Sequence, residues 1–311
     1  MNKVNRPVRA IAHTDRQGSS ISFAYGFGAY ALWGVLPIYF KLLQRIPAVD
    51  IVAHRVLWSL PFLALLIALS NGWSKVRSAF NSRKTLGVLA LTALLIGGNW
   101  LLYVYAVTSG HILAASFGYY LNPLANVLLG RFVLQERLSR LQWTAVAIAA
   151  VGISVLAAGA VGQLWISLTL CVTFALYGLL RKVVSADAVT GLAIETALLF
   201  PVAVLWLGWR GFGGEPVMGV TELDTGLLLA AGIVSTTPLL LFTAAARGLA
   251  YSTLGMLQFI APTMQFLIGV WYGEPFTSAH AIAFAAIWTA LGLYVTGLVR
   301  ARRQMLPQPP E

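Results

Sequence analysis

The sequence predicts an all-α integral membrane protein with ten transmembrane helices, arranged as two inverted repeats of five helices each. Its mean hydropathy is +0.79, and charged residues make up 10% of its 311 residues, whereas they make up about a quarter of a soluble domain. Two prolines, Pro123 and Pro262, lie 139 positions apart at matching points of two apolar segments. The composition therefore predicts the membrane class, and the matched prolines predict the repeat.

Ten apolar segments are long enough to cross a bilayer as helices, which takes about 20 residues. Their continuous apolar runs argue against a membrane β-barrel, whose strands alternate apolar and polar residues over about ten positions. The expected helices span residues 21–42, 50–70, 86–107, 111–133, 141–159, 163–181, 190–210, 225–246, 250–272 and 279–299.

Lysine and arginine are concentrated in segments that lie on one side of the membrane. With a cytoplasmic N-terminus, most of the 21 Lys and Arg residues fall in cytoplasmic segments, and only Lys41, Arg45 and Arg210 fall in external ones. Positive residues mark the cytoplasmic side, so both termini are expected there, with residues 1–20 and 300–311 as short tails without fixed structure. The net charge of +11 then reflects topology, and no nucleic-acid partner is expected.

The two expected repeats cover residues 21–159 and 163–299. At the 139-position offset Pro123 aligns with Pro262, and Asn126 aligns with Gln265. Because each repeat has an odd number of spans, the two halves must have opposite orientations, as in many alternating-access carriers. Chance similarity between apolar helices is the alternative, and the simultaneous agreement of several Pro, Gly and aromatic positions disfavours it.

Polar side chains and a proline share one face of the fourth and ninth expected helices, because positions i, i+3, i+4 and i+7 lie on one face. Each proline frees the carbonyl four residues earlier, so Pro123 and Pro262 are expected to act as helix hinges. Amides at such positions can instead hold neighbouring helices together. The residues expected to line a substrate pathway on these two faces are Tyr119, Asn122, Asn126, Gln258 and Gln265.

The third expected helix adds Asn99, Trp100 and Tyr103 to this pathway, and the sixth adds Tyr177. Aromatic and amide groups around a cavity suit a small organic molecule with an apolar body and a polar head. Packing between helices is an equal alternative for these rings. We expect the cavity to lie among the third, fourth, eighth and ninth helices, closed by the first and the sixth.

Arg55 and Glu195 are charged residues inside expected spans, at matching positions of the two repeats. A charge at such a place is costly and generally faces the bundle interior or water. Inverted symmetry places the two residues toward opposite mouths, so we expect them to act in gating or coupling rather than as one ion pair. Local snorkelling of the two side chains is the alternative to gating. Glu195 is also the candidate for proton coupling.

Four runs of residues give the chain a family resemblance: 96–102 (IGGNWLL), 118–124 (GYYLNPL), 177–182 (YGLLRK) and 257–262 (LQFIAP). They closely resemble the RarD-type permeases of the EamA family, in the drug/metabolite transporter superfamily, and the similarity extends over about residues 22–300. This resemblance implies ten helices in an inverted five-plus-five repeat, a bacterial inner membrane location, and export or exchange of small metabolites.

These features together predict a multi-pass secondary transporter that moves small organic metabolites or drugs by alternating access. An intramembrane enzyme and a non-transporting scaffold are the alternatives, but the sequence has no nucleophile–base grouping, metal-ligand spacing or phosphate-binding loop. We therefore expect no catalytic residue, metal or cofactor. The expected partners are a small-molecule substrate, the lipid bilayer and coupled protons, and a homodimer is left open. The single cysteine, Cys171, excludes an internal disulfide.

Overall fold

The computed structural model describes residues 8–108, 112–157, 164–271 and 278–304. Within these ranges the chain forms α-helices and no strand. The helices are α1 (Val8–Leu42), α2 (Ala48–Leu69), α3 (Trp73–Asn81), α4 (Arg83–Thr108), α5 (Ile112–Phe132), α6 (Arg140–Ala157), α7 (Leu164–Val183), α8 (Ala188–Phe212), α9 (Glu222–Gly248), α10 (Tyr251–Leu257), α11 (Ile260–Trp271) and α12 (Ser278–Gln304).

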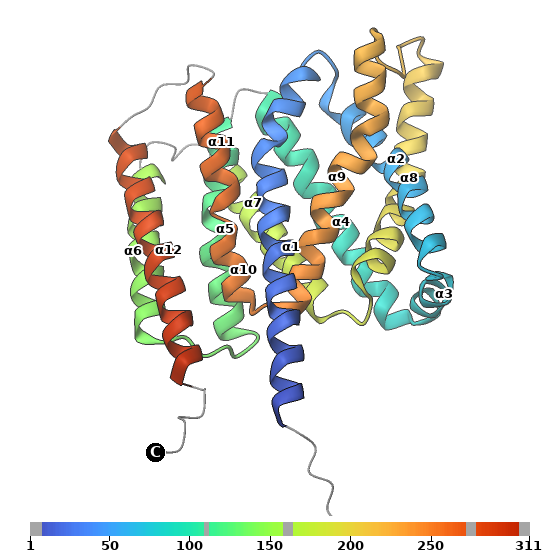
Figure 1. Cartoon of the computed structure of the whole chain (residues 1–311). Helices are drawn as coiled ribbons and strands as arrows, with labels where there is room; N and C mark the ends of the chain where they lie inside the picture. Colours follow the sequence, from blue (N-terminus) through green and yellow to red (C-terminus); the bar gives the residue numbers. More distant parts are fainter. Residues whose placement is uncertain (1–7, 109–111, 158–163, 272–277, 305–311) are drawn as a thin grey trace, which may run out of the picture.

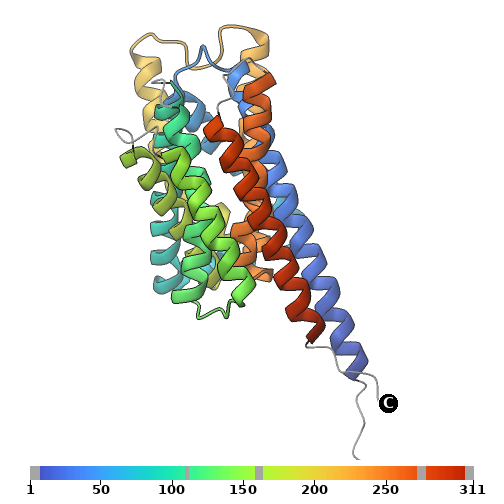
Figure 2. The same ribbon diagram turned by 90° about the vertical axis from the view of Figure 1, so that its left-hand side faces the viewer.

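Each of the ten expected ranges overlaps a helix, and the helices run side by side in one bundle (Figure 1). Helices α1 and α12 project past the others at what we call the lower end, where α1 begins and α12 ends (Figure 2). Six helical segments of the described chain are long and apolar enough to cross a membrane: Ser20–Leu42, Ala48–Leu69, Arg83–Ala106, Trp165–Val183, Ala188–Phe212 and Glu222–Gly248.

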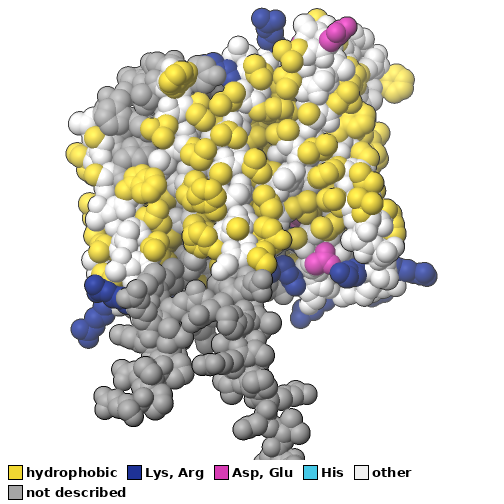
Figure 3. Space-filling model, viewed as in Figure 1, with side chains coloured by type: hydrophobic (Ala, Val, Ile, Leu, Met, Phe, Trp, Pro, Cys, Tyr) yellow, Lys and Arg dark blue, Asp and Glu magenta, His cyan; other side chains and the backbone are white. Residues whose placement is uncertain are grey.

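The surface also fits a bilayer. Figure 3 shows hydrophobic side chains over most of the height of the visible face, with Lys and Arg mainly along its lower edge. Large apolar side chains are exposed around the bundle. The exposed fraction is 69% for Leu94, 65% for Val151 and 73% for Leu205. Exposed apolar surface on this scale marks a membrane or partner contact rather than a water-facing surface.

Helical structure exceeds the sequence-based expectation at the lower end. Residues 8–20 were expected as an unstructured tail, but α1 begins at Val8, because no proline interrupts the chain between Val8 and the first span. The short helix α3 was expected as a loop. It exposes Trp73 and Phe80 beside Lys75 and Arg77, the amphipathic composition of a helix lying at a membrane surface. Residues 1–7 and 305–311 lie outside the described residues.

The ninth expected helix is divided into α10 and α11, with Gln258 and Phe259 between them. Pro262 lies in the first turn of α11, where a helix needs no backbone N–H donor, so proline fits that position without breaking a hydrogen bond. Pro123 instead lies inside α5, which continues past it. The two matched prolines therefore have different local structures: one begins a helix and the other is contained in one.

The packing order places two sets of helices around a common centre. Helix α1 contacts α9 and α11, α7 contacts α4 and α5, and α2 contacts α8 and α9, while α6 packs against α12 at the edge of the bundle. The main buried cluster lies between these helices and is rich in rings: Phe174 contacts Trp33 at 5.6 Å and Phe242 at 5.3 Å between ring centroids. This aromatic core surrounds the cavity described next.

Candidate functional site

A small cavity lies at the centre of the bundle, between helices of both halves of the chain. It leaves about 50 Å³ for the centres of water molecules, which is room for a few waters at about 10–15 Å³ each. Most of its walls are aromatic. The lining residues are Tyr30, Trp33, Leu36, Phe40, Trp100, Tyr103, Tyr119, Phe174, Gln258, Ala261, Pro262 and Gln265.

The rings around the cavity touch one another edge to face. Tyr103 is the centre of this arrangement, with ring centroids 6.3 Å from Trp100 and from Phe40 and 5.4 Å from Tyr119. Tyr119 in turn meets Phe174 at 6.3 Å and 88°. Tilted and perpendicular contacts are the preferred geometry of aromatic pairs. The wall is therefore a continuous apolar surface built from α1, α4, α5 and α7.

Two glutamine amides provide polar groups in this wall. Gln258, at the break between α10 and α11, accepts a 2.8 Å hydrogen bond at Oε1 from Nδ2 of Asn126 on α5. Gln265 donates from Nε2 to the carbonyl of Trp33 at 3.0 Å. The amide nitrogen of Gln258 donates to none of the described residues, so it is available to a molecule in the cavity.

Asn99 lies behind the cavity wall rather than in it. Its Nδ2 donates to the Leu170 carbonyl at 2.9 Å and to Thr173 Oγ1 at 2.8 Å, which ties α4 to α7. The hydroxyl of Tyr119 lies 3.5 Å from Asn99 Oδ1, at the limit for a hydrogen bond. Asn99 is thus placed to orient Tyr119, a lining residue.

Asn122 is fully buried in α5, and neither its Oδ1 nor its Nδ2 has a hydrogen-bond partner among the described residues. Buried amides are normally paired. It does not line the cavity, so the expected polar face of α5 is split: Tyr119 reaches the cavity, Asn126 holds Gln258, and Asn122 does neither. Pro123 lies between these positions and also stays outside the lining.

Arg55 stacks on Trp100, one of the residues that line the cavity. Its guanidinium carbon lies 3.1 Å from the centre of the Trp100 ring, and its side chain comes from α2, which does not line the cavity. Within the described chain it has no carboxylate within ion-pair distance and donates no hydrogen bond. Arg55 is only 8% exposed, so this charge is buried next to a lining residue.

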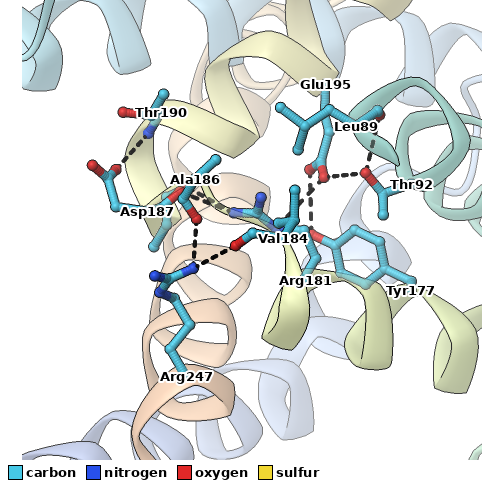
Figure 4. Close-up of polar contacts among 11 residues, drawn as sticks. Leu89, Thr92, Tyr177, Arg181, Val184, Ala186, Asp187, Thr190, Glu195 and Arg247 are labelled. Carbon is cyan, nitrogen blue, oxygen red and sulfur yellow. Dashed lines mark hydrogen bonds and ion pairs between the residues drawn. The ribbon is translucent and has the colours of Figure 1, made fainter. Parts of the chain in front are cut away.

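Glu195 on α8 is paired with a residue that the sequence reasoning missed. Figure 4 shows its carboxylate facing Arg181, Thr92 and Tyr177. Arg181 Nε lies 3.5 Å from Oε1, Thr92 Oγ1 donates to Oε1 at 2.6 Å, and the Tyr177 hydroxyl lies 3.4 Å from Oε2. Tyr177 therefore belongs to this cluster and not to the cavity lining.

Arg181 is one of the basic residues that the sequence assigns to cytoplasmic segments, but it is 0% exposed. Its Nη2 also donates to the carbonyls of Asp187 and Ala188, at 3.3 Å and 3.1 Å. A Cβ on Gly191 would collide with the guanidinium, so this glycine makes the space that Arg181 occupies. The signal in the sequence is the spacing: Gly191 lies four residues before Glu195, on the same face of α8.

The lower ends of α7 and α9 cap each other. Lys182 Nζ donates to the carbonyls of Ala246 and Leu249 at 2.9 Å and 2.5 Å. In return, Arg247 Nη1 donates to the carbonyls of Val184 and Ala186 at 3.0 Å and 2.7 Å (Figure 4). Cations suit the carbonyl ends of helices, and here each helix supplies the cation for the other.

Glu136 joins the α5–α6 loop to the start of α10. Its carboxylate accepts hydrogen bonds from the backbone N–H of Tyr251 at 2.6 Å and of Ser252 at 3.1 Å, and from Ser252 Oγ at 2.6 Å. A carboxylate at a helix N-terminus satisfies free N–H groups there. These contacts and the α7–α9 caps close the lower end of the bundle.

The upper end is held by a second set of polar contacts. Asp50 at the start of α2 lies 3.2 Å from Arg210 Nη2 and accepts a 2.9 Å hydrogen bond from Trp206 Nε1, both on α8. His54 Nε2 lies 2.7 Å from the carbonyl of Val217 in the α8–α9 connection. Polar contacts therefore tie both ends of the bundle, and the cavity lies between them.

Of the predicted pathway residues, the structure brings Trp100, Tyr103, Tyr119, Gln258 and Gln265 together around the cavity. The sequence reasoning did not select the lining residues of α1. Tyr30, Trp33 and Phe40 are aromatic residues of an apolar helix, which are equally expected in ordinary helix packing.

The fold and site define a multi-pass helical membrane protein with a central aromatic cavity. The model of the EamA-like transporter family matches residues 20–158. Protein RarD of Salmonella typhi is 43% identical over 302 residues, 94% of this chain and 99% of that protein. Protein RarD of Escherichia coli K12 is 42% identical over 94% and 98% of the two chains, and an uncharacterized transporter of Vibrio cholerae is 44% identical over 91% and 95%.

The chain therefore belongs to the EamA family as a RarD-type permease, a membrane transporter of the drug/metabolite superfamily. A solved crystal structure with 19% sequence identity superimposes with a TM-score of 0.67, covering 89% of this chain and 98% of that one. At this identity the superposition establishes a shared fold and nothing more.

Proposed function

We propose that the protein is a secondary transporter that carries small organic molecules through the central cavity by alternating access. The observation that carries this proposal is the aromatic cavity between the two halves of the chain, with separate polar contacts at the lower and the upper end of the bundle, which we call the two closures. Opening one closure at a time would expose the cavity to one side of the membrane and then to the other. A largely apolar cavity with a few polar groups suits small organic ligands.

The pattern of helix contacts supports the inverted repeat. We pair α1 with α7, α2 with α8, α4 with α9, α5 with α10 and α11, and α6 with α12. Exchanging the members of each pair converts the contact α1–α9 into α4–α7, α1–α11 into α5–α7, and α2–α9 into α4–α8, while α2–α8 and α6–α12 are unchanged. The match of the family model to residues 20–158 also fits a first repeat of residues 21–159.

The two closures would be the gates. The lower one contains Glu195 with Arg181, and the upper one contains Asp50 with Arg210. Protonation of Glu195 would remove the charge that holds Arg181, which would weaken the lower closure and link proton uptake to opening. Helix termini and breaks near the centre, such as that at Gln258, are typical of transporter binding sites.

The basic lower end would face the cytoplasm of a bacterial inner membrane, because positive residues mark the cytoplasmic side. Basic residues at the lower end include Lys75, Arg83, Arg137 and Arg247, whereas those at the upper end are Lys41, Arg45 and Arg210. Both termini would then be cytoplasmic. Modification of single cysteines by a reagent added from one side of sealed vesicles would establish this orientation.

Cysteine accessibility tests the central pathway. In a Cys171→Ala background, Tyr119→Cys and Gln258→Cys should react with a membrane-impermeant thiol reagent, and a transported substrate should change the rate. Asn122→Cys is the matched control, since Asn122 is buried on α5 outside the cavity. Equal protection of positions 119, 122 and 258 would refute the central pathway.

Transport itself is tested with purified protein in proteoliposomes and a panel of small organic metabolites, with and without a pH gradient. The proposal expects saturable uptake or efflux of at least one solute. If Glu195 couples protons, Glu195→Gln should lose the acceleration by a pH gradient and keep solute exchange. Absence of protein-dependent flux for every solute, with folded protein, would contradict the proposed function.

A further inference from the structure

The buried charges of the described chain are matched, with one exception. Asp50 pairs with Arg210, and Arg181 pairs with Glu195. The buried carboxylate of Asp224 accepts the N–H of Thr221 in the capping box of α9. Arg55 alone among them has no acidic or hydrogen-bonding partner in the described residues, and this positive charge lies beside the cavity.

An unmatched charge of this kind is costly in a membrane interior. Arg55 is 8% exposed, and charged groups within membrane helices are normally paired or face water. The hydroxyls of Tyr39, Tyr119 and Tyr177 lie near enough to interact electrostatically with the guanidinium, but neutral hydroxyls offset only part of a full charge. An anion in the cavity would supply the missing counter-charge.

The stacking on Trp100 leaves the binding edge of Arg55 unused. Trp100 covers the flat face of the guanidinium, with Cζ 3.1 Å from the ring centre. The five N–H donors of arginine lie in the guanidinium plane and match a carboxylate by two parallel hydrogen bonds. Stacking therefore fixes the orientation of the fork while its donors stay available.

The other residues that line the cavity indicate the shape of the rest of the bound anion. Seven of the lining residues are aromatic, and Gln258 provides an unused amide N–H₂. A flat apolar body would pack against Tyr103, Tyr119 and Phe174, whose rings stand at steep angles to one another. A single anionic head group would be balanced by the single positive charge.

We propose that the transported solute is an organic anion with a planar apolar body and a carboxylate head, and that Arg55, held on Trp100, selects the carboxylate. This inference rests on the proposed transport function and narrows its substrate class. It assigns Arg55 to substrate selection, whereas the closures at the two ends contain the buried ion pairs.

Three probes of the same shape and different charge test it: benzoate (negative), benzamide (neutral) and benzamidine (positive). Binding to the purified protein is measured by calorimetry and by tryptophan fluorescence, because Trp33 and Trp100 line the cavity. We expect benzoate to bind at least about tenfold more tightly than benzamide, the range expected for hydrogen bonds to charged groups. Benzamidine should bind most weakly.

Arg55→Gln should weaken benzoate binding by about tenfold or more and change benzamide binding less than about twofold. Arg55→Lys keeps the charge without the planar fork and should fall between wild type and Arg55→Gln. Arg45→Gln is the matched control. It removes the same charge from the exposed α1–α2 connection and should leave the order of the three probes unchanged.

Equal binding of benzoate and benzamide to the wild-type protein would overturn the inference, even if Arg55→Gln does not fold. So would a preference for benzoate that persists in Arg55→Gln. The proteoliposome panel separates this failure from failure of the proposed function: flux of neutral or cationic solutes without flux of anions refutes the anion class and leaves transport intact. Absence of any flux refutes transport itself.

Discussion

Two ion pairs at the lower end of the bundle have the same separation and very different exposure. The nearest N–O distance is 3.5 Å both between Arg181 and Glu195 and between Lys75 and Asp187. The side chains of the first pair are 0% and 1% exposed, and those of the second are 69% and 40% exposed. The same change, carboxylate to amide, can therefore be made in a buried pair and in an exposed one.

Glu195→Gln leaves the Arg181 charge buried without its partner, which typically costs about 3–5 kcal/mol. Asp187→Asn removes the partner of an exposed lysine, worth about 0–1 kcal/mol, and asparagine retains the N-cap acceptor that Asp187 offers to Thr190 N. Burial by itself raises the pKa of the Asp187 carboxyl, but hydrogen bonds from Thr190 and the charge of Lys75 outweigh burial and lower it. Asp187 is thus ionised at pH 7, and Asp187→Asn removes a full charge from the exposed pair.

Thermal unfolding of the purified protein at one scan rate compares the two variants. We expect Glu195→Gln to lower the transition temperature by several degrees and Asp187→Asn to leave it nearly unchanged. The double variant Arg181→Met with Glu195→Gln should recover much of the loss, because no buried charge is left unpaired. If Glu195→Gln is as stable as Asp187→Asn, the Arg181–Glu195 pair is not the buried interaction that we describe.

Three further predictions follow from the packing and capping contacts. Gly191→Ala should destabilise the protein by about 2 kcal/mol or more, since overpacking costs about 1–3 kcal/mol and the new methyl group meets Arg181. Gly208→Ala is the control, because Gly208 lies in the same helix with open space around it. It should be neutral or slightly stabilising in the same unfolding assay. Glu136→Ala should lower the free energy of unfolding by about 1–2 kcal/mol, because it uncaps α10. Glu136→Gln keeps one acceptor oxygen, so a smaller loss of stability in that variant would separate capping from general disruption. Lys182→Met combined with Arg247→Met should speed thiol labelling of Gln258→Cys from the lower side, and unchanged labelling would show that these caps do not hold the lower end closed.

The sequence predicted helix positions well because long apolar runs have few alternatives in a membrane. It predicted an interruption at both matched prolines. The structure has a break at Gln258 and Phe259, before Pro262, but α5 continues past Pro123, because a proline is compatible both with the first turn of a helix and with the interior of one. The sequence did not predict α3, which is too short and too polar to register as a span.

The candidate site was predictable where polar or aromatic residues stand out in apolar helices, as at Tyr119 and Gln258. It was not predictable where the deciding factor is a contact between distant segments. The burial of Arg181 depends on the space above Gly191, and the contribution of Phe40 depends on how α1 lies against α4. Neither contact can be predicted from the composition of a single helix.

The reciprocal caps between α7 and α9 affect how orientation experiments on this protein can be read. Lys182 and Arg247 belong to the basic residues that direct membrane insertion, and in the folded protein they also bind the carbonyl ends of the opposite helices. Neutralising them to reverse the insertion of a helix would at the same time loosen one face of the finished protein. A charge-reversal series at these two positions therefore cannot separate biogenesis from conformational equilibrium, whereas exposed residues such as Arg77 can change the insertion signal alone.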